Sequence, residues 1–338
     1  MTDKLIRKSA IVVGATGFVG SHIVRNLLEK GYYVEGTCRN VLSAQWLFDC
    51  MPNKEKLKLH ELILDVEATS EHTLARLISD DCKGIFMCAG YEKQEPSTID
   101  FMKNAAMTTL KASEISNVKP CVVLTSSTGS TNLPGAPPDA LKNEIDFWSD
   151  PELQKSKNKW SPAAKTLMEI NSLAFVGRNK KNEVVNAKMA DNKPRLCIMN
   201  PSLILGPQFK PGKILGNGLP FFERVVRGKT MTEKIWNDSM SIIHVDDLAK
   251  LHIGCIENEA ASGRYFGVEQ SWHWEDICLA IQAAEGDSFR MPPIDYIERT
   301  AVTKFDTVRR DTLMADFNLR GLKTLVSQSC EFLRSKEL

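Results

Sequence analysis

Three glycines near the start of the chain, Gly14, Gly17 and Gly20, constrain its fold more than any other feature. They follow a short apolar run at residues 10–13 and open a segment with helical periodicity at residues 21–30. In a strand–turn–helix unit the first glycine permits the sharp turn, the second lets the backbone approach a phosphate, and the third lets the helix pack on its strand. The helix amides and its positive dipole end then face a dinucleotide pyrophosphate. The residues of this turn that we expect at the cofactor are Gly14, Thr16, Gly17, Phe18, Val19 and Gly20.

The residues after the second expected strand indicate which dinucleotide is bound. Gly31 ends the helix, residues 32–38 form the strand pattern, and Arg39 and Asn40 follow it. An NAD site usually has Asp or Glu near this strand end to hold the ribose hydroxyls. Glu35 lies too early in the strand for that role. The guanidinium of Arg39 suits a 2′-phosphate through paired, charge-assisted hydrogen bonds, so NADP(H) is predicted. The alternative is that Arg39 is a solvated surface arginine.

Strand-like and helix-like segments alternate through the first two hundred residues. The further expected strands are 58–64, 84–89, 120–125 and 195–199, and the further expected helices are 70–78, 97–116 and 162–175. This alternation predicts a Rossmann-type α/β fold, a doubly wound parallel sheet with helices on both faces. After Pro201 the pattern becomes irregular until an amphipathic helix at 322–333, which predicts a smaller C-terminal lobe. We therefore expect a dinucleotide-binding domain over residues 1–200, to which residues 240–256 return, and a substrate lobe within 201–338.

Two polar segments, residues 132–158 and 178–193, interrupt the alternation and are expected to be surface excursions. The formal net charge of +1 does not favour a nucleic-acid or membrane-surface partner. No apolar segment approaches the roughly 18 residues of a membrane span, and the start of the chain leaves no room for a signal peptide. The nine scattered cysteines contain no CxxC pair, so we expect neither a metal site nor disulfides. We expect a cytoplasmic protein with a small-molecule substrate.

The order of the motifs resembles the extended short-chain dehydrogenase/reductase superfamily, which includes the NAD-dependent epimerase/dehydratase-like proteins. Within it, the chain is similar to the dihydroflavonol reductase, cinnamoyl-CoA reductase and aldehyde reductase group. The segments that carry the resemblance, besides the glycine turn with Arg39, are Asp65-Val66, Thr125-Ser126-Ser127, Lys165-Thr-Leu-Met-Glu169, Asn200-Pro-Ser-Leu-Ile-Leu-Gly-Pro207, Ile243-His-Val-Asp-Asp-Leu-Ala249 and Phe305-Asp306. The resemblance spans nearly the whole chain.

The resemblance implies further contacts to the cofactor. Asp65 would accept a hydrogen bond from the adenine amine, with Val66 beside the ring, and Ala89 and Gly90 would line the cofactor after the fourth strand. The residues that would lie against the nicotinamide are Pro201, Ser202 and Leu203. The remaining residues placed at the cofactor are Asn40, Thr125, Ser126 and Lys165.

The catalytic residues implied by the resemblance are a serine or threonine, a tyrosine and a lysine. Ser127 matches the serine and Lys165 matches the lysine, although a turn hydroxyl and a surface lysine are the alternatives. The tyrosine position, four residues before the lysine and on the same helix face, holds Ser161. The preceding Trp160 is no proton source at neutral pH. Tyr91, just after the fourth expected strand, is a candidate substitute acid, or else a tyrosine that covers the pocket wall.

Three functions stay open. The first is NADPH-dependent reduction of a small aldehyde or ketone, in which Ser127, Ser161 and a water, or Tyr91, supply the proton. The second is hydride addition to a conjugated C=C bond, where hydrogen-bond donors hold the enolate. The third is a non-catalytic NADP(H)-binding protein that serves as a sensor or structural clamp. Retention of Lys165 and Ser127 favours an enzyme, and carbonyl reduction is the function we expect.

Three expectations concern structure rather than chemistry. Asp246 or Asp247 caps the helix that follows it, and His244 packs at a strand end. Residues 206–220, rich in Gly and Pro, either order over the ligand as a lid or form an ordinary connection. A homodimer through the two long helices near 97–116 and 162–175 stays open.

Overall fold

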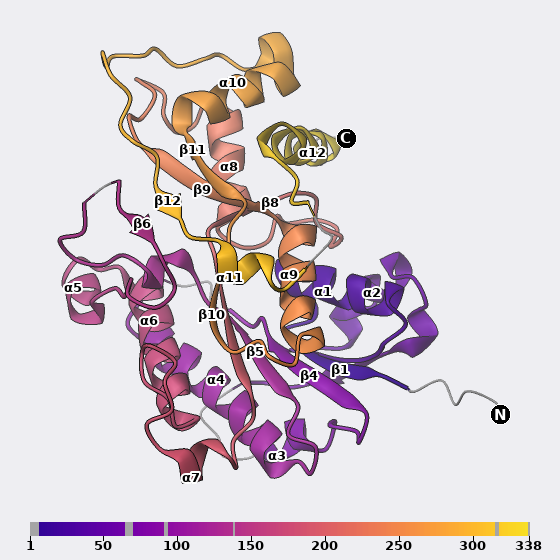
Figure 1. Cartoon of the computed structure of the whole chain (residues 1–338). Helices are drawn as coiled ribbons and strands as arrows, with labels where there is room; N and C mark the ends of the chain where they lie inside the picture. Colours follow the sequence, from indigo (N-terminus) through magenta and orange to yellow (C-terminus); the bar gives the residue numbers. More distant parts are fainter. Residues whose placement is uncertain (1–6, 65–69, 91–93, 138, 315–317, 337–338) are drawn as a thin grey trace.

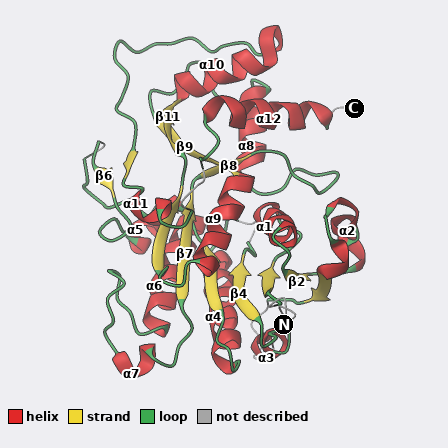
Figure 2. Ribbon diagram, turned by 45° about the vertical axis from the view of Figure 1, so that its right-hand side comes forward, coloured by secondary structure: helices red, strands yellow, loops and turns green. Residues whose placement is uncertain are grey.

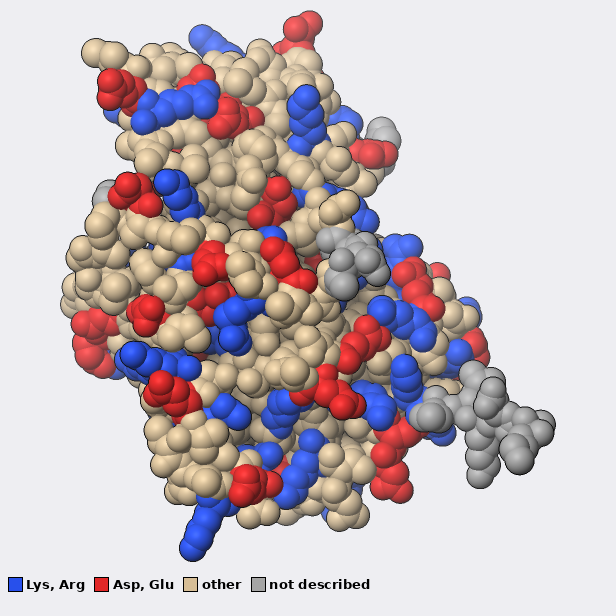
Figure 3. Space-filling model, viewed as in Figure 1, with Lys and Arg blue, Asp and Glu red and all other residues tan. Residues whose placement is uncertain are grey.

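A computed structural model of the chain describes residues 7–64, 70–90, 94–137, 139–314 and 318–336. The expectations for Asp65, Val66 and Tyr91 therefore lie outside the described residues. Of the helices that the structure describes, none combines the length and the apolar character of a membrane span. Figure 3 shows acidic and basic side chains interspersed over one face of the molecule, without a broad field of a single sign.

Seven parallel strands form the main sheet, in the order β10-β7-β5-β4-β1-β2-β3. Their bounds are β1 (Ser9–Val13), β2 (Tyr33–Cys38), β3 (Leu57–Glu61), β4 (Cys82–Met87), β5 (Cys121–Thr125), β7 (Leu196–Pro201) and β10 (Gly263–Gly267). The strand order reverses between β1 and β4, and ligands of such sheets bind at the carboxyl edge beside this switch point. The parallel sheet and its alternation with helices are as predicted. Strand β10, contributed by the C-terminal third of the chain, was not expected from the sequence.

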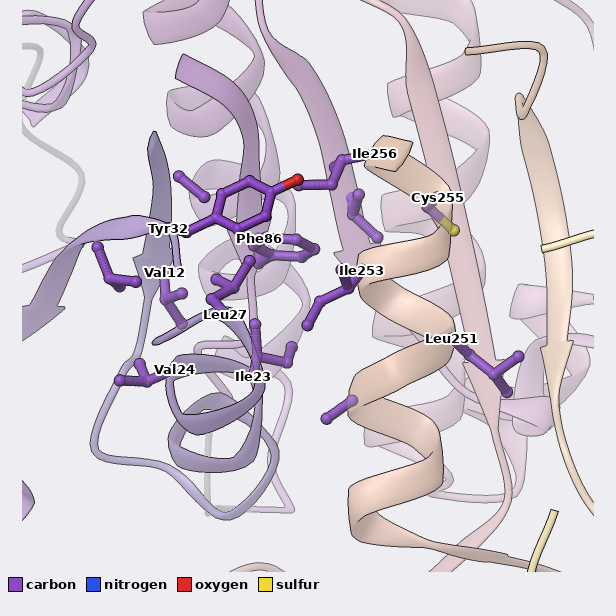
Figure 4. Packing of buried hydrophobic residues seen from close by; sticks show 14 of the residues in the cluster. Val12, Ile23, Val24, Leu27, Tyr32, Phe86, Leu251, Ile253, Cys255 and Ile256 are labelled. Carbon is purple, nitrogen blue, oxygen red and sulfur yellow. The ribbon is translucent and has the colours of Figure 1, made fainter. Parts of the chain in front are cut away.

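Helices cover both faces of this sheet (Figures 1 and 2). Their bounds are α1 (Phe18–Glu29), α2 (Trp46–Cys50), α3 (Ser70–Ala75), α4 (Ser97–Ile115), α5 (Pro151–Ser156), α6 (Trp160–Phe175), α7 (Ala187–Ala190) and α9 (Val245–Glu257). Alternate residues of each strand pack on opposite faces. Along β5, Val123 joins the core beneath α1 and α9, whereas Val122 and Leu124 join the core beneath α4 and α6. Figure 4 shows the first of these cores, where Ile23 and Leu27 of α1 face α9.

A smaller lobe lies above the carboxyl edge of the main sheet (Figure 1). Its sheet, in the order β11-β9-β8, consists of β8 (Leu203–Leu205), β9 (Ser239–His244) and β11 (Gln270–His273). Its helices are α8 (Gly218–Val226), α10 (Trp274–Glu285) and α12 (Leu322–Ser335). The short α11 (Val308–Asp311) packs instead on β10 of the main sheet. A separate core that includes Phe222, Trp274 and Leu325 stabilises this lobe. Between β8 and α8, the buried Gln208 holds the connection by bonding the carbonyls of Lys210 and Lys213.

The two polar excursions differ from one another in the structure. Residues 178–193 are exposed or half-buried, as expected. The expectation for residues 132–158 is wrong in its middle part, because Glu144, Phe147 and Trp148 are buried. This segment also contributes β6 (Leu141–Lys142), which pairs with β12 (Lys304–Phe305) of the C-terminal part. The polar composition of this segment gave no indication that its middle part packs against the rest of the protein.

Candidate active site

The glycine turn closes tightly against the ends of β1 and β4. Gly14 has a φ of +84°, and a Cβ atom there would lie 2.9 Å from the backbone nitrogen of Ala89. A Cβ atom at Gly20 would collide with the Gly14 carbonyl oxygen, so only glycine lets α1 pack this closely. Gly17 is the N-cap of α1 and supplies no side-chain cap. The first amides of α1 are thus left for an anion at the carboxyl edge.

Three neighbours of the glycines, Thr16, Phe18 and Val19, contribute differently. Phe18 was predicted at the cofactor, but its side chain is 8% exposed and belongs to the core of the smaller lobe. Only its backbone amide, at the first position of α1, faces the expected phosphate position. Val19 is half-buried and packs between the two lobes' cores, and Thr16 is half-buried at the tip of the turn. Ala89 and Gly90 follow β4 at the same edge.

The end of β2 presents an exposed cation. Arg39 and Asn40 are both exposed, and no described residue forms an ion pair with the Arg39 guanidinium. Asn40 is used locally, since its Oδ1 accepts the Ser43 amide at 2.9 Å. Glu35 is engaged mid-strand with His60, with 2.6 Å between Oε2 and Nε2, and does not reach the strand end. The exposed carboxylate of Glu61, at the end of the neighbouring β3, is engaged by the Val41 amide at 3.1 Å. The charged side chain that directly follows β2 is therefore the cation Arg39, which suits a 2′-phosphate.

Lys165 and Ser127 meet at the carboxyl end of β5. The Nζ atom of Lys165, on α6, donates to the Thr125 carbonyl at 2.6 Å, and its side chain is half-buried. Burial lowers the pKa of Lys165 to about 8, against the opposing effect of the nearby Glu169 charge. Ser127 Oγ accepts the Gly129 amide at 3.0 Å, which leaves its hydroxyl proton for another acceptor. Ser127 is thus a turn hydroxyl that keeps a donor free, and Lys165 is held in place rather than solvated.

Ser161 lies in the first turn of α6 and is half-buried. The adjacent Pro162 packs on the turn that carries Ser127, because a Cβ atom at Gly129 would lie 3.3 Å from the Pro162 Cβ. Gln154 ties the same two segments together, donating to the Gly129 carbonyl at 2.7 Å and accepting from Thr166 of α6 at 3.0 Å. The three predicted residues Ser127, Ser161 and Lys165 are therefore carried by two segments in direct contact.

Thr125 and Ser126 were predicted at the cofactor, but their hydroxyls bond within the protein. The Thr125 hydroxyl lies 2.9 Å from Nε2 of the buried His252 on α9. The Ser126 hydroxyl donates to Glu169 on α6, on the opposite face of the sheet. Strand alternation explains the split, since successive side chains point to opposite faces. Both hydroxyls are therefore engaged within the protein, as are the Thr125 carbonyl, which accepts from Lys165, and the Ser126 amide, which bonds the Met199 carbonyl.

Sequence reasoning did not identify the buried ion pair beneath the site. Glu169 and Arg264 are 0% and 3% exposed, and Arg264 Nε lies 2.8 Å from Glu169 Oε2. The available signal was an arginine in the middle of the strand sequence Gly263-Arg-Tyr-Phe-Gly267, which is otherwise apolar and small. A charged residue in such a strand is seldom buried without a partner.

The segment from Pro201 to Leu203 joins β7 of the main sheet to β8 of the smaller lobe. Pro201 is buried, Ser202 is half-buried, and Leu203 is 9% exposed within the core of the smaller lobe. These residues thus cross from one lobe to the other at the carboxyl edge.

His244 is buried at the end of β9, as expected, but the expectation that Asp246 or Asp247 caps α9 is wrong. His244 itself caps α9, because its Nδ1 accepts the Asp246 amide at 3.1 Å. Asp246 instead accepts a hydrogen bond from Asn26 of α1 at 2.8 Å and lies 3.1 Å from Arg320. Although burial opposes it, hydrogen bonding to the carboxylate holds the pKa of Asp246 well below its ordinary value. Asp247 also pairs with Arg320.

The comparisons agree with this architecture. Residues 10–148 match the model of the NAD dependent epimerase/dehydratase family. The chain is 32% identical over 275 residues to cinnamoyl-CoA reductase 2 of Arabidopsis thaliana, covering 80% of this chain and 75% of the relative. It is 30% identical over 280 residues to anthocyanidin reductase of the same plant, covering 76% and 75%.

Solved structures share the fold over nearly the whole chain. Gre2 from Candida albicans superposes with a TM-score of 0.80 at 21% identity, covering 98% of this chain and 100% of that one. Vestitone reductase from alfalfa (Medicago sativa) superposes with a TM-score of 0.77 at 23% identity, covering 98% and 99%. The chain belongs to the NAD dependent epimerase/dehydratase family, that is, to the extended short-chain dehydrogenases/reductases.

Proposed function

We propose that this protein is an NADPH-dependent reductase of a small aldehyde or ketone. The observation that carries the proposal is the placement of Lys165, whose ammonium is fixed on the Thr125 carbonyl beside the Ser127 turn. Burial of a lysine at this position is unfavourable for its charged form and lowers its pKa to about 8. A group with such a pKa can give up a proton near neutral pH, as a general acid must.

NADP(H) is the cofactor that the chain's own residues favour. The uncapped amides of α1 and the close approach of Gly14 to Ala89 suit a pyrophosphate, and Arg39 suits a 2′-phosphate. Structural neighbours include Gre2 of Candida albicans and the yeast methylglyoxal/isovaleraldehyde reductase Gre2, each in complex with NADPH. The relatives in sequence are named as reductases of cinnamoyl-CoA and of anthocyanidins.

The residues of the site divide the chemistry between them. The α1 amides and Arg39 would hold NADPH, which when bound would supply the hydride for the carbonyl carbon of the substrate. The Ser127 hydroxyl donates a hydrogen bond to the carbonyl oxygen and keeps its proton, which stabilises the negative charge that develops on that oxygen. The Lys165 ammonium provides the proton that completes the alcohol, passed through the Ser161 hydroxyl or a water, and the neutral amine regains a proton from solvent. Ser161 alone is too weak an acid to replace a phenol.

A second function is favoured by one observation. Ser161 occupies the position of the family tyrosine, and a protein that only binds NADP(H), as a sensor or clamp, would not need that tyrosine. The two functions are separated by measuring NADPH and NADH binding by calorimetry and then NADPH oxidation with aldehydes, ketones and enones. Oxidation with an aldehyde or ketone, lost in Lys165→Met, supports the reductase. Tight binding without oxidation supports the sensor, and oxidation only with enones supports C=C reduction.

A further inference from the structure

The ion pair between Glu169 and Arg264 is deeply buried, and both residues form several further hydrogen bonds through their other atoms. Besides Glu169, the Arg264 guanidinium bonds the carbonyls of Glu144, Phe147 and Ser130 at 2.9–3.1 Å. Its Cζ atom also lies 3.8 Å from the centre of the Trp148 ring. Burying two charges is costly, and an apolar pair of similar volume often gives equal or higher stability. Such a pair therefore calls for an explanation other than stability.

The second carboxylate oxygen of Glu169 accepts hydrogen bonds from three segments around the turn that carries Ser127. Oε1 accepts from Ser126 at the end of β5, from Ser130 at 2.5 Å in the following turn, and from Asn200 of β7 at 2.7 Å. Asn200 Nδ2 also bonds the Ser127 carbonyl, at 3.1 Å. The residues on both sides of Ser127, and its own carbonyl, are thus fixed through this one carboxylate.

We propose that the Glu169–Arg264 pair is the positioning element of the active site, holding the Ser127 turn in register with Lys165. Glu169 follows Lys165 by one helical turn of α6, so the carboxylate that fixes Ser127 and the ammonium of the site share one rigid element. Arg264 ties the same carboxylate to β10 and to the docked 144–148 segment. The inference rests on the reductase function proposed above, in which Ser127 and Lys165 act on one carbonyl group.

The pair has an electrostatic effect on the site in addition to its geometric one. Among the described residues, the ionisable groups acting on Lys165 are Glu169 on its own helix and the Cys88 thiol after β4, and both favour the charged ammonium. Burial raises the pKa of Cys88 to about 11, so this thiol stays uncharged near neutral pH. The charge of Glu169 is therefore the main influence that keeps Lys165 protonated.

The test compares two variants of the pair with a control. Glu169→Gln keeps an acceptor oxygen but removes the negative charge, and Arg264→Gln removes the cation but keeps the carboxylate. Val326→Ala removes side-chain volume from the fully buried core of the smaller lobe and supplies a matched loss of stability. For each full-length variant we would measure Tm, NADPH affinity, kcat, and the pH dependence of kcat.

We expect kcat to fall about 10- to 100-fold in both pair variants, the effect of displacing a catalytic group by about 1 Å. NADPH affinity should change little, and Val326→Ala should lose stability with kcat unchanged. The alkaline limb of kcat should move to lower pH in Glu169→Gln and not in Arg264→Gln. The proposal is overturned if both pair variants lose Tm but, like Val326→Ala, keep the wild-type kcat, and if the alkaline limb of the kcat profile does not move in Glu169→Gln.

A labelling experiment separates this inference from the proposed function. The pH dependence of Lys165 methylation by formaldehyde and a borohydride, read by peptide mass spectrometry, reports the ionisation of Lys165 without turnover. A lower midpoint in Glu169→Gln than in the wild type supports the coupling between the two residues, and equal midpoints contradict it. Wild-type protein that binds NADPH without turnover would contradict the reductase function while the labelling result still decides the coupling.

Discussion

The substitution Lys165→Arg tests the proton source directly. Arginine keeps a positive charge and a donor to the Thr125 carbonyl, but it cannot release a proton at any pH used for proteins. Lys165 differs because its pKa is lowered from 10.5 to about 8. At 1.36 kcal/mol per pH unit, this displacement corresponds to about 3 kcal/mol of selective destabilisation of the ammonium in the folded protein. That same destabilisation makes the ammonium a competent acid.

The expected loss follows from the usual contribution of a positioned acid. General acid catalysis contributes about 10²- to 10⁴-fold, so kcat of Lys165→Arg should fall by that factor while NADPH affinity changes little. The wild type should lose activity as the pH rises through about 8, because the donor form of Lys165 disappears. The assay is NADPH oxidation at saturating substrate across this range, with calorimetry for the cofactor. Retention of wild-type kcat in Lys165→Arg, or a flat wild-type profile, would refute the reasoning.

The same group has a consequence for stability. Because the folded-state pKa of Lys165 lies below its unfolded value, the unfolded chain binds more protons between about 8 and 10.5. The Lys165 contribution to the free energy of unfolding should therefore rise with pH in this window. The difference between wild type and Lys165→Met, measured by urea unfolding at several pH values, isolates that contribution.

Three other predictions concern single substitutions. Ser161→Tyr restores a phenol one helical turn from Lys165 and should raise kcat. A kcat that is unchanged or lower, with NADPH affinity intact, would show that another group already supplies the proton. Arg39→Ala should weaken NADPH binding by about 1.5–3 kcal/mol, the worth of a hydrogen bond to a charged group. NADH affinity should stay constant, and equal losses for both cofactors by calorimetry would exclude the 2′-phosphate contact. Gly20→Ala places a methyl group on the Gly14 carbonyl and should cost about 1–3 kcal/mol of unfolding free energy, with NADPH binding weakened; wild-type values of both would contradict the packing argument.

The main sheet was predictable because its strands carry local signals. The central strands are short apolar runs, the edge strand at 58–64 mixes apolar and polar residues, and the glycine turn identifies where the first strand ends. Strand β10 gives no such signal, because Arg264 interrupts its apolar pattern. Its assignment depends on the buried partner Glu169, far earlier in the chain, and no local periodicity reveals a long-range ion pair. The burial of Trp148 and Glu144 was hidden for the same reason, since Arg264 is what engages that segment.

The candidate site was predicted by position more successfully than by side-chain direction. Ser127 and Lys165 come together at the end of β5 as the motif order implied. Thr125 and Ser126 are adjacent in sequence to Ser127, but strand alternation sends one hydroxyl to His252 and the other to Glu169. Which of three consecutive hydroxyl residues faces a ligand depends on where the strand stops. That boundary is not fixed by composition.

The central claim is that this chain uses bound NADPH to reduce a carbonyl group although Ser161 replaces the family tyrosine. The most direct measurement is the fate of deuterium carried on the reactive nicotinamide carbon of NADPH, followed by mass spectrometry and NMR of the product from an aldehyde, a ketone and an enone. The account predicts deuterium on the former carbonyl carbon of the aldehyde or ketone product, with Lys165→Arg strongly impaired. Deuterium only on the β-carbon of the enone product, or no transfer from tightly bound NADPH to any of the three, would contradict it.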